Sequence, residues 1–167
     1  MTSTAAKRKA SCSDAQQLAE ELIVAELSKI VGVELNSAEL KLGITKVSVD
    51  GFAQNGNRVV LVEAWAHIGK IKSAQRNKIH SDLLKLGLIR TGLLRSDPSL
   101  TVDSYIAFAD EAAAAIVKSG RCWASAAARE FGITPRVVKL PEEVLQKIRE
   151  AQKRQDIREP DENENHD

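Results

Sequence analysis

Apolar residues recur along this chain with two different periods, and the alternation predicts a β-sheet packed between helices. Residues 15–31 follow the helical period, and Asp14 is a plausible N-cap for that helix. Residues 44–52 and 58–68 have extended character and flank an Asn-Gly turn within 53–57. These two runs predict an antiparallel hairpin, and the second run is apolar on both faces, which is typical of a central strand.

The second half of the chain alternates helices with strands. A strand, a helical connection and another strand form a parallel βαβ unit, because parallel neighbours need a crossover. We therefore predict an α/β fold with a central mixed sheet, combining the antiparallel hairpin with a parallel βαβ unit, flanked by helices. The elements expected here are a helix at 70–86, a strand at 102–110, helical residues 111–132 interrupted at Ser119 and Gly120, a strand at 135–140, and a helix at 142–155.

Length and composition indicate one folded domain with two polar ends. The 167 residues are 43% hydrophobic, which suits a single core. We place that domain at residues 14–155. Residues 1–13 hold a "KRK" cluster and are expected to form a disordered basic arm, and residues 156–167 hold six acids and one base and are expected to form a disordered acidic tail.

Cysteine content and hydropathy limit the class of protein. The two cysteines, Cys12 and Cys122, are too few for a disulfide framework or a zinc site. No run approaches the roughly 18 apolar residues of a membrane span, and the first residues lack the apolar block of a secretory signal. We expect a cytoplasmic protein that does not enter membranes.

Several polar residues fall on faces that are otherwise apolar. Glu26 lies on the buried stripe of the first helix, and Glu63, Trp65 and His67 share one face of the second strand. Asp50 ends the first strand of the hairpin. Each has an ordinary structural interpretation: Glu26 as a boundary residue, His67 as a hydrogen-bonded core histidine, and Trp65 as core packing.

Positive charge is concentrated in the middle of the chain. The net charge is +1, but without the acidic tail the remaining residues hold 23 bases and 17 acids. Between Arg58 and Arg95 there are eight bases against Glu63 and Asp82. Such a region attracts polyanions, although a run of charges is also typical of a solvated helix face.

Asp50 in "VSVDGF" and Glu63 in "VLVEAW", on the two strands of the predicted hairpin, resemble the motif of the PD-(D/E)XK nuclease superfamily. The order of the expected elements from residue 15 to 140 is also similar to that superfamily. The resemblance implies a restriction endonuclease-like core and a metal-dependent nuclease that hydrolyses phosphodiester bonds, with DNA as the expected substrate. The superfamily's motif lysine is replaced here by Trp65.

The resemblance also implies a metal site. Mg²⁺ or Mn²⁺ would be bound by Asp50 and Glu63, and an acid on the first helix often completes such a site, a role that Glu26 would take. Carboxylates are the ligands that Mg²⁺ prefers, and a bound metal can activate water and stabilise charge on a phosphate.

A cation from the following helix could replace the missing motif lysine. The run "QRNK" offers Gln75 and Lys78, which are adjacent on a helix at i and i+3. We therefore predict Asp50, Glu63, Gln75 and Lys78 as catalytic residues, while Lys85 is expected to point elsewhere. The predicted nucleic-acid contacts are Lys70, Lys72, Arg76 and Lys78.

Two other classes of function stay open. In one, the loss of the motif lysine marks a catalytically inactive module that binds nucleic acid or serves as a protein-interaction subunit. In the other, the chain is a small subunit whose acidic tail docks on a basic partner. A homodimer or a larger protein complex is compatible with each of these hypotheses. Trp65 and Trp123 could stack on bases, but core packing is the commoner role of tryptophan.

Overall fold

The computed structural model describes the backbone of residues 3–156 and the side chains of residues 14–154 except that of Ala74. The predicted acidic tail lies outside the described residues, apart from Asp156 at the end of the last helix. The elements in chain order are α1 (Ser3–Val31), β1 (Asn36–Leu42), β2 (Thr45–Asn55), β3 (Arg58–Trp65), α2 (Ser73–Ser96), β4 (Thr101–Phe108), α3 (Glu111–Lys118), α4 (Trp123–Glu130), β5 (Ile133–Val137) and α5 (Glu142–Asp156).

The five strands form one mixed sheet in the order β1-β2-β3-β4-β5. The pairs β1–β2 and β2–β3 are antiparallel, and the pairs β3–β4 and β4–β5 are parallel. The predicted hairpin, β2–β3, and the predicted parallel unit, β4–β5, are therefore confirmed, and the parallel pair β3–β4 joins them. Because β3 is paired on both sides and covered on both faces, its residues from Val59 to Trp65 are all buried.

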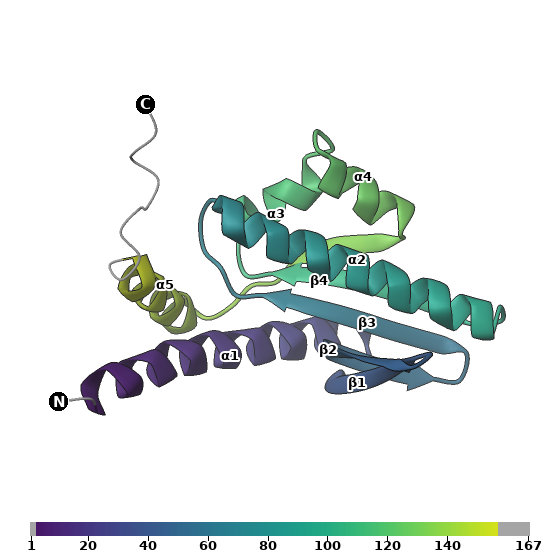
Figure 1. The fold of residues 1–167 in the computed structure, drawn as a ribbon, viewed down its shortest axis with the longest axis horizontal. Helices are drawn as coiled ribbons and strands as arrows, with labels where there is room; N and C mark the ends of the chain where they lie inside the picture. The colour runs from purple at the N-terminus through teal and green to yellow at the C-terminus, as the bar shows by residue number, and fades with distance from the viewer. Residues whose placement is uncertain (1–2, 157–167) are drawn as a thin grey trace.

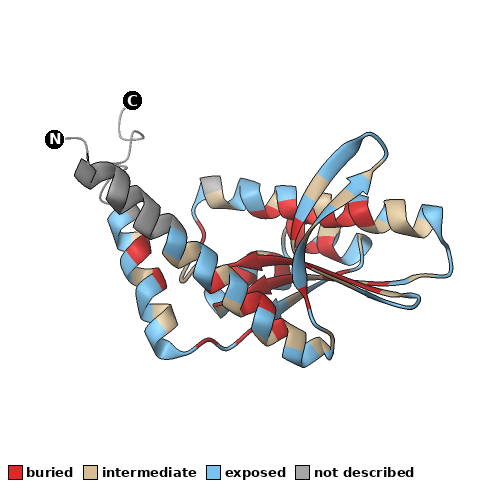
Figure 2. Ribbon diagram, turned by 90° about the horizontal axis from the view of Figure 1, so that it is seen from below, coloured by how far each residue is buried: buried red, intermediate tan, exposed pale blue. Residues whose placement is uncertain are grey.

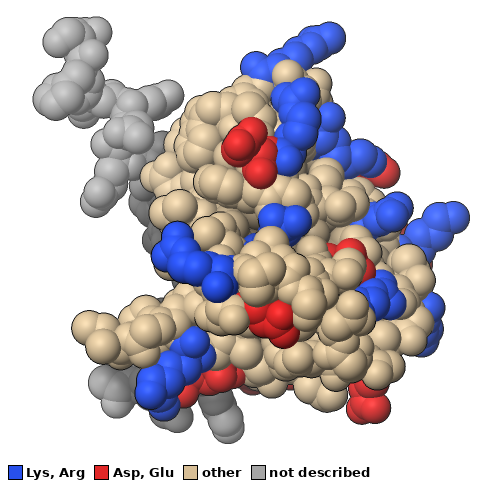
Figure 3. Space-filling view, turned by 90° about the vertical axis from the view of Figure 1, so that its right-hand side faces the viewer, with Lys and Arg blue, Asp and Glu red and all other residues tan. Residues whose placement is uncertain are grey.

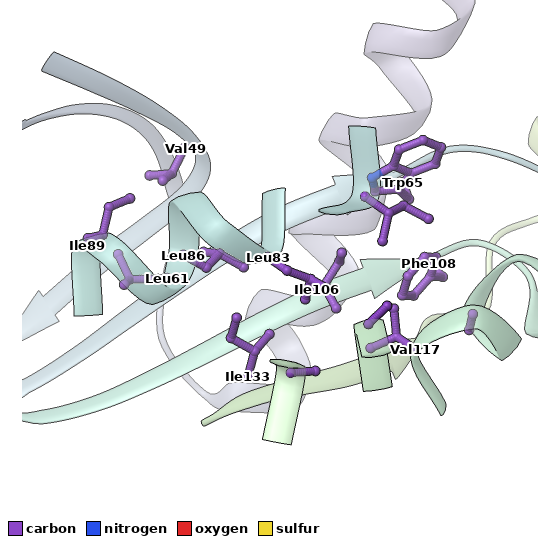
Figure 4. Close-up of a cluster of buried hydrophobic side chains, with 14 of the residues drawn as sticks. Val49, Leu61, Trp65, Leu83, Leu86, Ile89, Ile106, Phe108, Val117 and Ile133 are labelled. Carbon is purple, nitrogen blue, oxygen red and sulfur yellow. The ribbon is translucent and has the colours of Figure 1, made fainter. Parts of the chain in front are cut away.

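Helices cover both faces of the sheet (Figure 1). Helices α1 and α5 lie on one face, where α1 presents a stripe of buried residues to the strands (Figure 2). Helices α2, α3 and α4 lie on the other face. Side chains on this second face form the larger core, in which Trp65 and Phe108 lie at the same end of the adjacent strands β3 and β4 (Figure 4).

Three elements differ from the sequence-based expectations. Strand β1 was not predicted, because an edge strand with one half-exposed face has no apolar run, and "NSAELKL" alternates exposed with half-buried positions. Helix α2 continues to Ser96, about ten residues beyond the predicted end. Helix α1 begins at Ser3 and includes most of the predicted basic arm, so Asp14 is not its N-cap. No helix in the described part of the chain combines the length and the apolar character that crossing a membrane requires.

Candidate functional site

The site begins where β2 and β3 separate. Their pairing extends from Asn55–Arg58 to Gly51–Val62 and includes no pair beyond Gly51. On its other side β2 shifts register, because a step of two residues along β1, from Asn36 to Ala38, matches a step of three along β2, from Phe52 to Val49. The extra residue lies at Asp50–Gly51, so β2 bulges there and turns away from β3.

Gly51 allows helix α1 to approach this bulge closely. A Cβ atom at Gly51 would lie 3.1 Å from Cγ1 of Val24 in α1 and 3.1 Å from Cβ of Val62. Both neighbours are buried and cannot withdraw easily. The absence of a side chain at position 51 therefore brings α1 against the opening between the two strands.

Asp50 satisfies the backbone that the separation leaves unpaired. The amide of Ala64 donates a hydrogen bond of 2.8 Å to Oδ2 of Asp50, in the region where a strand partner would otherwise accept it. The side chain is half-buried. One carboxylate oxygen is thus fixed by β3, which holds the charge of Asp50 beside the neighbouring residue Glu63.

Glu63 is a buried carboxyl group with an incompletely satisfied environment. The residue is 4% exposed, and Nζ of Lys85 lies 2.8 Å from its Oε1. That contact is an ion pair rather than a well-directed hydrogen bond, since Oε1 has no partner with hydrogen-bond geometry among the side chains that the structure describes. Burial first, and then the charge of Asp50, raise the pKa of Glu63 to about 8, against the opposing effect of Lys85.

Lys85 joins Glu63 to a second buried acid, Asp82, one turn earlier on α2. Nζ of Lys85 lies 3.6 Å from Oδ1 of Asp82, and the indole Nε1–H of Trp65 donates a 3.0 Å hydrogen bond to Oδ2. The expectation that Lys85 points elsewhere is wrong, because an amine in this position offsets the desolvation of two carboxyl groups. Asp82 is itself buried, with 7% of its surface exposed.

The acid that α1 contributes is Glu20 and not Glu26. Burial raises the pKa of Glu20, and the charges of Asp50 and Asp82 add to this effect, which places Glu20 within electrostatic range of the site. Its Oε1 accepts a 3.0 Å hydrogen bond from Gln16. Glu26 instead forms a 2.6 Å ion pair with Lys29 and is no part of the cluster.

The direction of α1 explains this difference. The helix runs antiparallel to β3, with Val31 accepting a hydrogen bond from Arg58 at the start of the strand and Val24 packing near Val62. Six residues of helix advance about 9 Å. Glu26 is therefore displaced by that distance toward the start of β3, whereas Glu20 lies level with its end.

Glu20, Asp50, Glu63 and Asp82 form the acid cluster. Lys78 and Gln75 lie beside this cluster and have different roles. Nζ of Lys78 lies 5.0 Å from the centroid of the Trp65 ring, a cation–π distance, and its charge acts on Glu20. Oε1 of Gln75 accepts a 2.8 Å hydrogen bond from the Lys72 amide and thereby caps α2, while its Nε2 lies 3.3 Å from Nδ1 of His67. Gln75 therefore acts on the backbone and on His67.

A pocket of about 280 Å³ adjoins the acid cluster at the end of β3. The loop that borders it is fixed by Gln152 of α5, which accepts a 3.0 Å hydrogen bond from the Ile68 amide and donates one of 3.1 Å to the Ile68 carbonyl. The residues that line the pocket are Gln16, Trp65, Ala66, His67, Gln75, Lys78 and Gln152. Lys78 lines the pocket, and its charge also acts on Glu20 of the acid cluster.

The predicted metal ligands are only partly brought together. Among residues 14–154, no three His, Cys, Asp or Glu side chains are arranged so that they could hold a metal ion. Asp50 and Glu63 neighbour each other, and Glu26 is remote. Two carboxylates still match the donor chemistry of Mg²⁺, which retains several waters when bound to proteins. On α1, Glu20 is the acid whose pKa the charge of Asp50 raises.

The predicted basic region divides into half-buried members that are ion-paired and members that are exposed. Arg58 is paired with Asp103 at 2.8 Å, and Lys85 is paired with Glu63 at 2.8 Å. Lys70, Arg76 and Lys78 are exposed near the start of α2, as is Lys72. The molecule has no single basic face on the side drawn in Figure 3, where Lys and Arg are separated by uncharged surface.

Sequence reasoning missed Glu20 and the role of Lys85. The signal for Lys85 was present, since it follows Asp82 by three residues and Gln75 by ten, and these three residues fall on one helical stripe. Glu20 is followed directly by a second acid, Glu21, and no local signal distinguishes the two. Comparison of the chain with protein-family models, with curated proteins and with solved structures gave no match.

Proposed function

We propose that this protein is a metal-dependent nuclease that hydrolyses phosphodiester bonds in nucleic acid, with DNA as its substrate, at the opening between β2 and β3. The observation that supports this proposal best is the placement of Asp50 and Glu63 at that opening, with Lys85 against Glu63. Two neighbouring carboxyl groups can bind a divalent metal ion, and a cation beside them can stabilise negative charge on a phosphate.

The order of elements is consistent with a restriction endonuclease-like core. A helix, three antiparallel strands, a helix and a parallel strand follow one another, and the two acids lie on the second and third strands. The superfamily's lysine position is Trp65, whose indole instead hydrogen-bonds Asp82. Lys85 takes the lysine's place in this proposal, because its amine reaches Glu63 from α2.

Asp50 and Glu63 would hold Mg²⁺ or Mn²⁺, which when bound supplies a Lewis acid and lowers the pKa of water. Glu63 must be ionised for that role, and Lys85 favours the ionised form. Lys85 would then be free to contact a phosphate oxygen or the attacking water. Lys78, exposed at the edge of the pocket, would contact a neighbouring phosphate of the substrate strand.

The test is cleavage of supercoiled plasmid, linear duplex and single strands with Mg²⁺ or Mn²⁺. Asp50→Asn keeps a side-chain oxygen for the Ala64 amide, and Glu63→Gln keeps the buried volume, so both should fold. Each should lose at least about a hundredfold in rate, because the groups act together. Lys85→Ala should show a similar loss, and Glu20→Gln a smaller one.

Glu26→Gln is the matched control, because it removes an acid of the same helix outside the cluster. It should cleave like the wild type. Activity that persists unchanged in Asp50→Asn belongs to a contaminant or to another site, and a folded wild-type protein that cuts none of these substrates with either metal contradicts the proposal.

A non-catalytic nucleic-acid-binding module is the second candidate. The observation in its favour is the closed state of the cluster, in which Lys85 lies between Glu63 and Asp82 and already offsets their charge. In that case a divalent cation relieves little charge repulsion at the site and binds weakly or not at all. Millimolar Mn²⁺ should then leave the melting temperature unchanged, whereas the nuclease proposal requires a rise that Asp50→Asn abolishes.

A further inference from the structure

A second pocket, of about 460 Å³, lies between the start of α2, the helix α3 and the start of α4. Its polar and aromatic lining comes from five side chains: Lys70, Arg76, His80, Ser119 and Trp123. No Asp or Glu lines it among the residues that the structure describes, and neither Lys70 nor Arg76 forms an ion pair with any of those residues. The pocket therefore keeps uncompensated positive charge.

The wall of the pocket on the α3 side is fixed by Asp110. Oδ2 of Asp110 accepts hydrogen bonds from the amides of Ala112 and Ala113, which caps α3, and from the amide of Gly69 at 2.9 Å. The loop before α2 is thereby tied to the start of α3. Lys70 follows Gly69 directly, so its backbone has a defined place at the rim.

The opposite wall is fixed between α3 and α4. The carbonyl of Ile116 accepts hydrogen bonds from Sγ of Cys122 at 2.9 Å and from Oγ of Ser125 at 3.2 Å. Ser125 also accepts from the Gly120 amide at 3.2 Å. These contacts hold the turn that leads into α4 and place Trp123, its first residue, at the mouth of the pocket.

Trp123 presents an exposed aromatic face beside this charge. The residue is 62% exposed, and its ring centroid lies 4.1 Å from that of His80 with the planes inclined at 45°. An exposed aromatic ring that is already supported by another ring is a platform on which a planar group can stack. Arg76 lies one helical turn before His80, within reach of a charge attached to such a group.

We propose that this pocket binds an unpaired nucleotide of a single-stranded nucleic-acid segment, with the base on Trp123 and the adjacent phosphates at Lys70 and Arg76. Base stacking combined with basic side chains and no acids is the usual chemistry of single-strand binding. This inference rests on the proposed function and specifies its substrate: the strand that reaches the acid cluster is held by a single-stranded stretch.

Helix α2 links the two sites. Arg76 and His80 face this pocket, while Lys78 and Asp82 face the acid cluster, and all four belong to two successive turns. A nucleic-acid strand that leaves the pocket can therefore cross the first turns of α2 to Lys78, because Arg76 and Lys78 are only about 3 Å apart along the helix axis. Duplex DNA cannot offer an unstacked base to Trp123 without opening, so single strands should bind better than duplexes of equal length.

An apolar contact with a second copy is the competing use of the same surface. Trp123 also borders an apolar hollow lined by Leu83, Leu84, Ala127 and Phe131, and Leu84 is 63% exposed. Charge favours the nucleic acid, because a dimer formed through this surface would bury the positively charged side chains of Lys70 and Arg76 in its interface. The test below includes self-association as an outcome that overturns the proposal.

The experiment uses Trp123 as its own reporter, since the chain has two tryptophans. In Trp65→Phe, titration with oligothymidine in EDTA should quench the fluorescence of Trp123 to saturation, at lower concentration than a duplex of the same length. Trp123→Ala, followed by anisotropy of a labelled strand, should weaken binding roughly 5- to 150-fold, the range for one stacked base. If Trp65→Phe does not fold, wild-type protein labelled with 5-fluorotryptophan reports Trp123 as one of two resonances.

Charge variants complete the test. Arg76→Ala and Lys70→Ala should each weaken single-strand binding about tenfold and reduce the salt dependence by about one phosphate contact. Arg95→Ala is the matched control, because it removes an exposed base from the far end of the same helix. Wild-type affinity in both Trp123→Ala and Arg76→Ala overturns the proposal, as does a Trp123 signal that follows protein concentration without nucleic acid.

Failure of this proposal is separable from failure of the proposed function, because binding is measured in EDTA. Quenching of Trp123 without cleavage in any metal supports the pocket and contradicts the nuclease. Cleavage that Asp50→Asn abolishes, with Trp123 silent toward every strand, supports the nuclease and contradicts the pocket.

Discussion

The acid cluster and the basic pocket lie on adjoining sides of α2 but hold their charges in opposite ways. Glu63 and Asp82 are buried, and Lys85 offsets them from within the fold. Lys70 and Arg76 are exposed and face no acid in the pocket. Buried charge has to be compensated by the protein itself, whereas exposed charge is compensated by water and stays available to a ligand.

The difference determines what each region responds to. The acid cluster depends on protonation, on its internal lysine and on the packing of α1. The basic pocket depends on salt and on the loops that hold its rim. Changes directed at one region should therefore leave the other intact, and the following four tests begin with the largest expected effect.

Raising the pH should destabilise the folded protein through Glu63. Its pKa in the fold is about 8, above the ordinary value of 4.5, so between these values the folded state binds more protons than the unfolded state. Stability is then lost as the pH rises through that window, by at most about 5 kcal/mol. Urea unfolding in EDTA at about pH 5 and pH 9 measures the loss, and Glu63→Gln should reduce it. If the unfolding free energy of Glu63→Gln falls with pH as steeply as that of the wild type, the pH dependence comes from another group.

Removal of Lys85 should be the most destabilising single change in the acid cluster. Lys85→Met keeps the aliphatic stem but leaves Glu63 and Asp82 without their cation, at a cost of about 3 kcal/mol for a buried pair. The loss should be greater at high pH, where Glu63 cannot escape by protonation. Denaturation at two pH values tests this.

Lys29→Met is the control for that measurement, because Lys29 pairs with Glu26 at the surface. It should cost less than about 1 kcal/mol. Equal effects of the two lysine substitutions would mean that the cluster is no more sensitive than the surface.

A side chain at Gly51 should disturb the acid cluster alone. Gly51→Val places carbon atoms against Val24 and Val62 and forces α1 away from the bulge, at a cost of about 1–3 kcal/mol. Cleavage should fall, because Glu20 moves with the helix, while quenching of Trp123 by oligothymidine should persist. Loss of both together would show that the regions are coupled through the sheet.

Asp110 provides the smallest test, on the other side of the comparison. Asp110→Ala removes the cap of α3 and the anchor of the Gly69 amide, at a cost of about 1 kcal/mol. Single-strand affinity should fall a few fold as the Lys70 loop loosens, and the pH dependence of stability should be unchanged. Asp97→Ala, which removes a carboxyl group bonded to Ser99 far from the pocket, is the control.

The two acids at the strand separation were predictable because a strand has a simple period. Alternation along 58–68 places Glu63 on the face of Trp65, and the Asn-Gly turn aligns the strand that holds Asp50. The buried position of Asp82 followed from the helical period in the same way. What the period leaves undetermined is where a helix crosses a sheet, so Glu26 and Glu20 could not be ranked before the direction of α1 was known.

Local pattern thus determined the α/β class, the mixed sheet with β3 at its centre, and the presence of polar groups on the buried face of α2. Tertiary structure decided which of these groups meet. Four features depend on residues that are distant in sequence: the bulge at Asp50–Gly51, the position of Glu20 near Asp50, the contact of Lys85 with Glu63, and the shared pocket of Lys70 and Trp123. Periodicity reports only neighbours within a few residues, whereas burial and charge act through space, and the packing of distant elements therefore decides which charges come together.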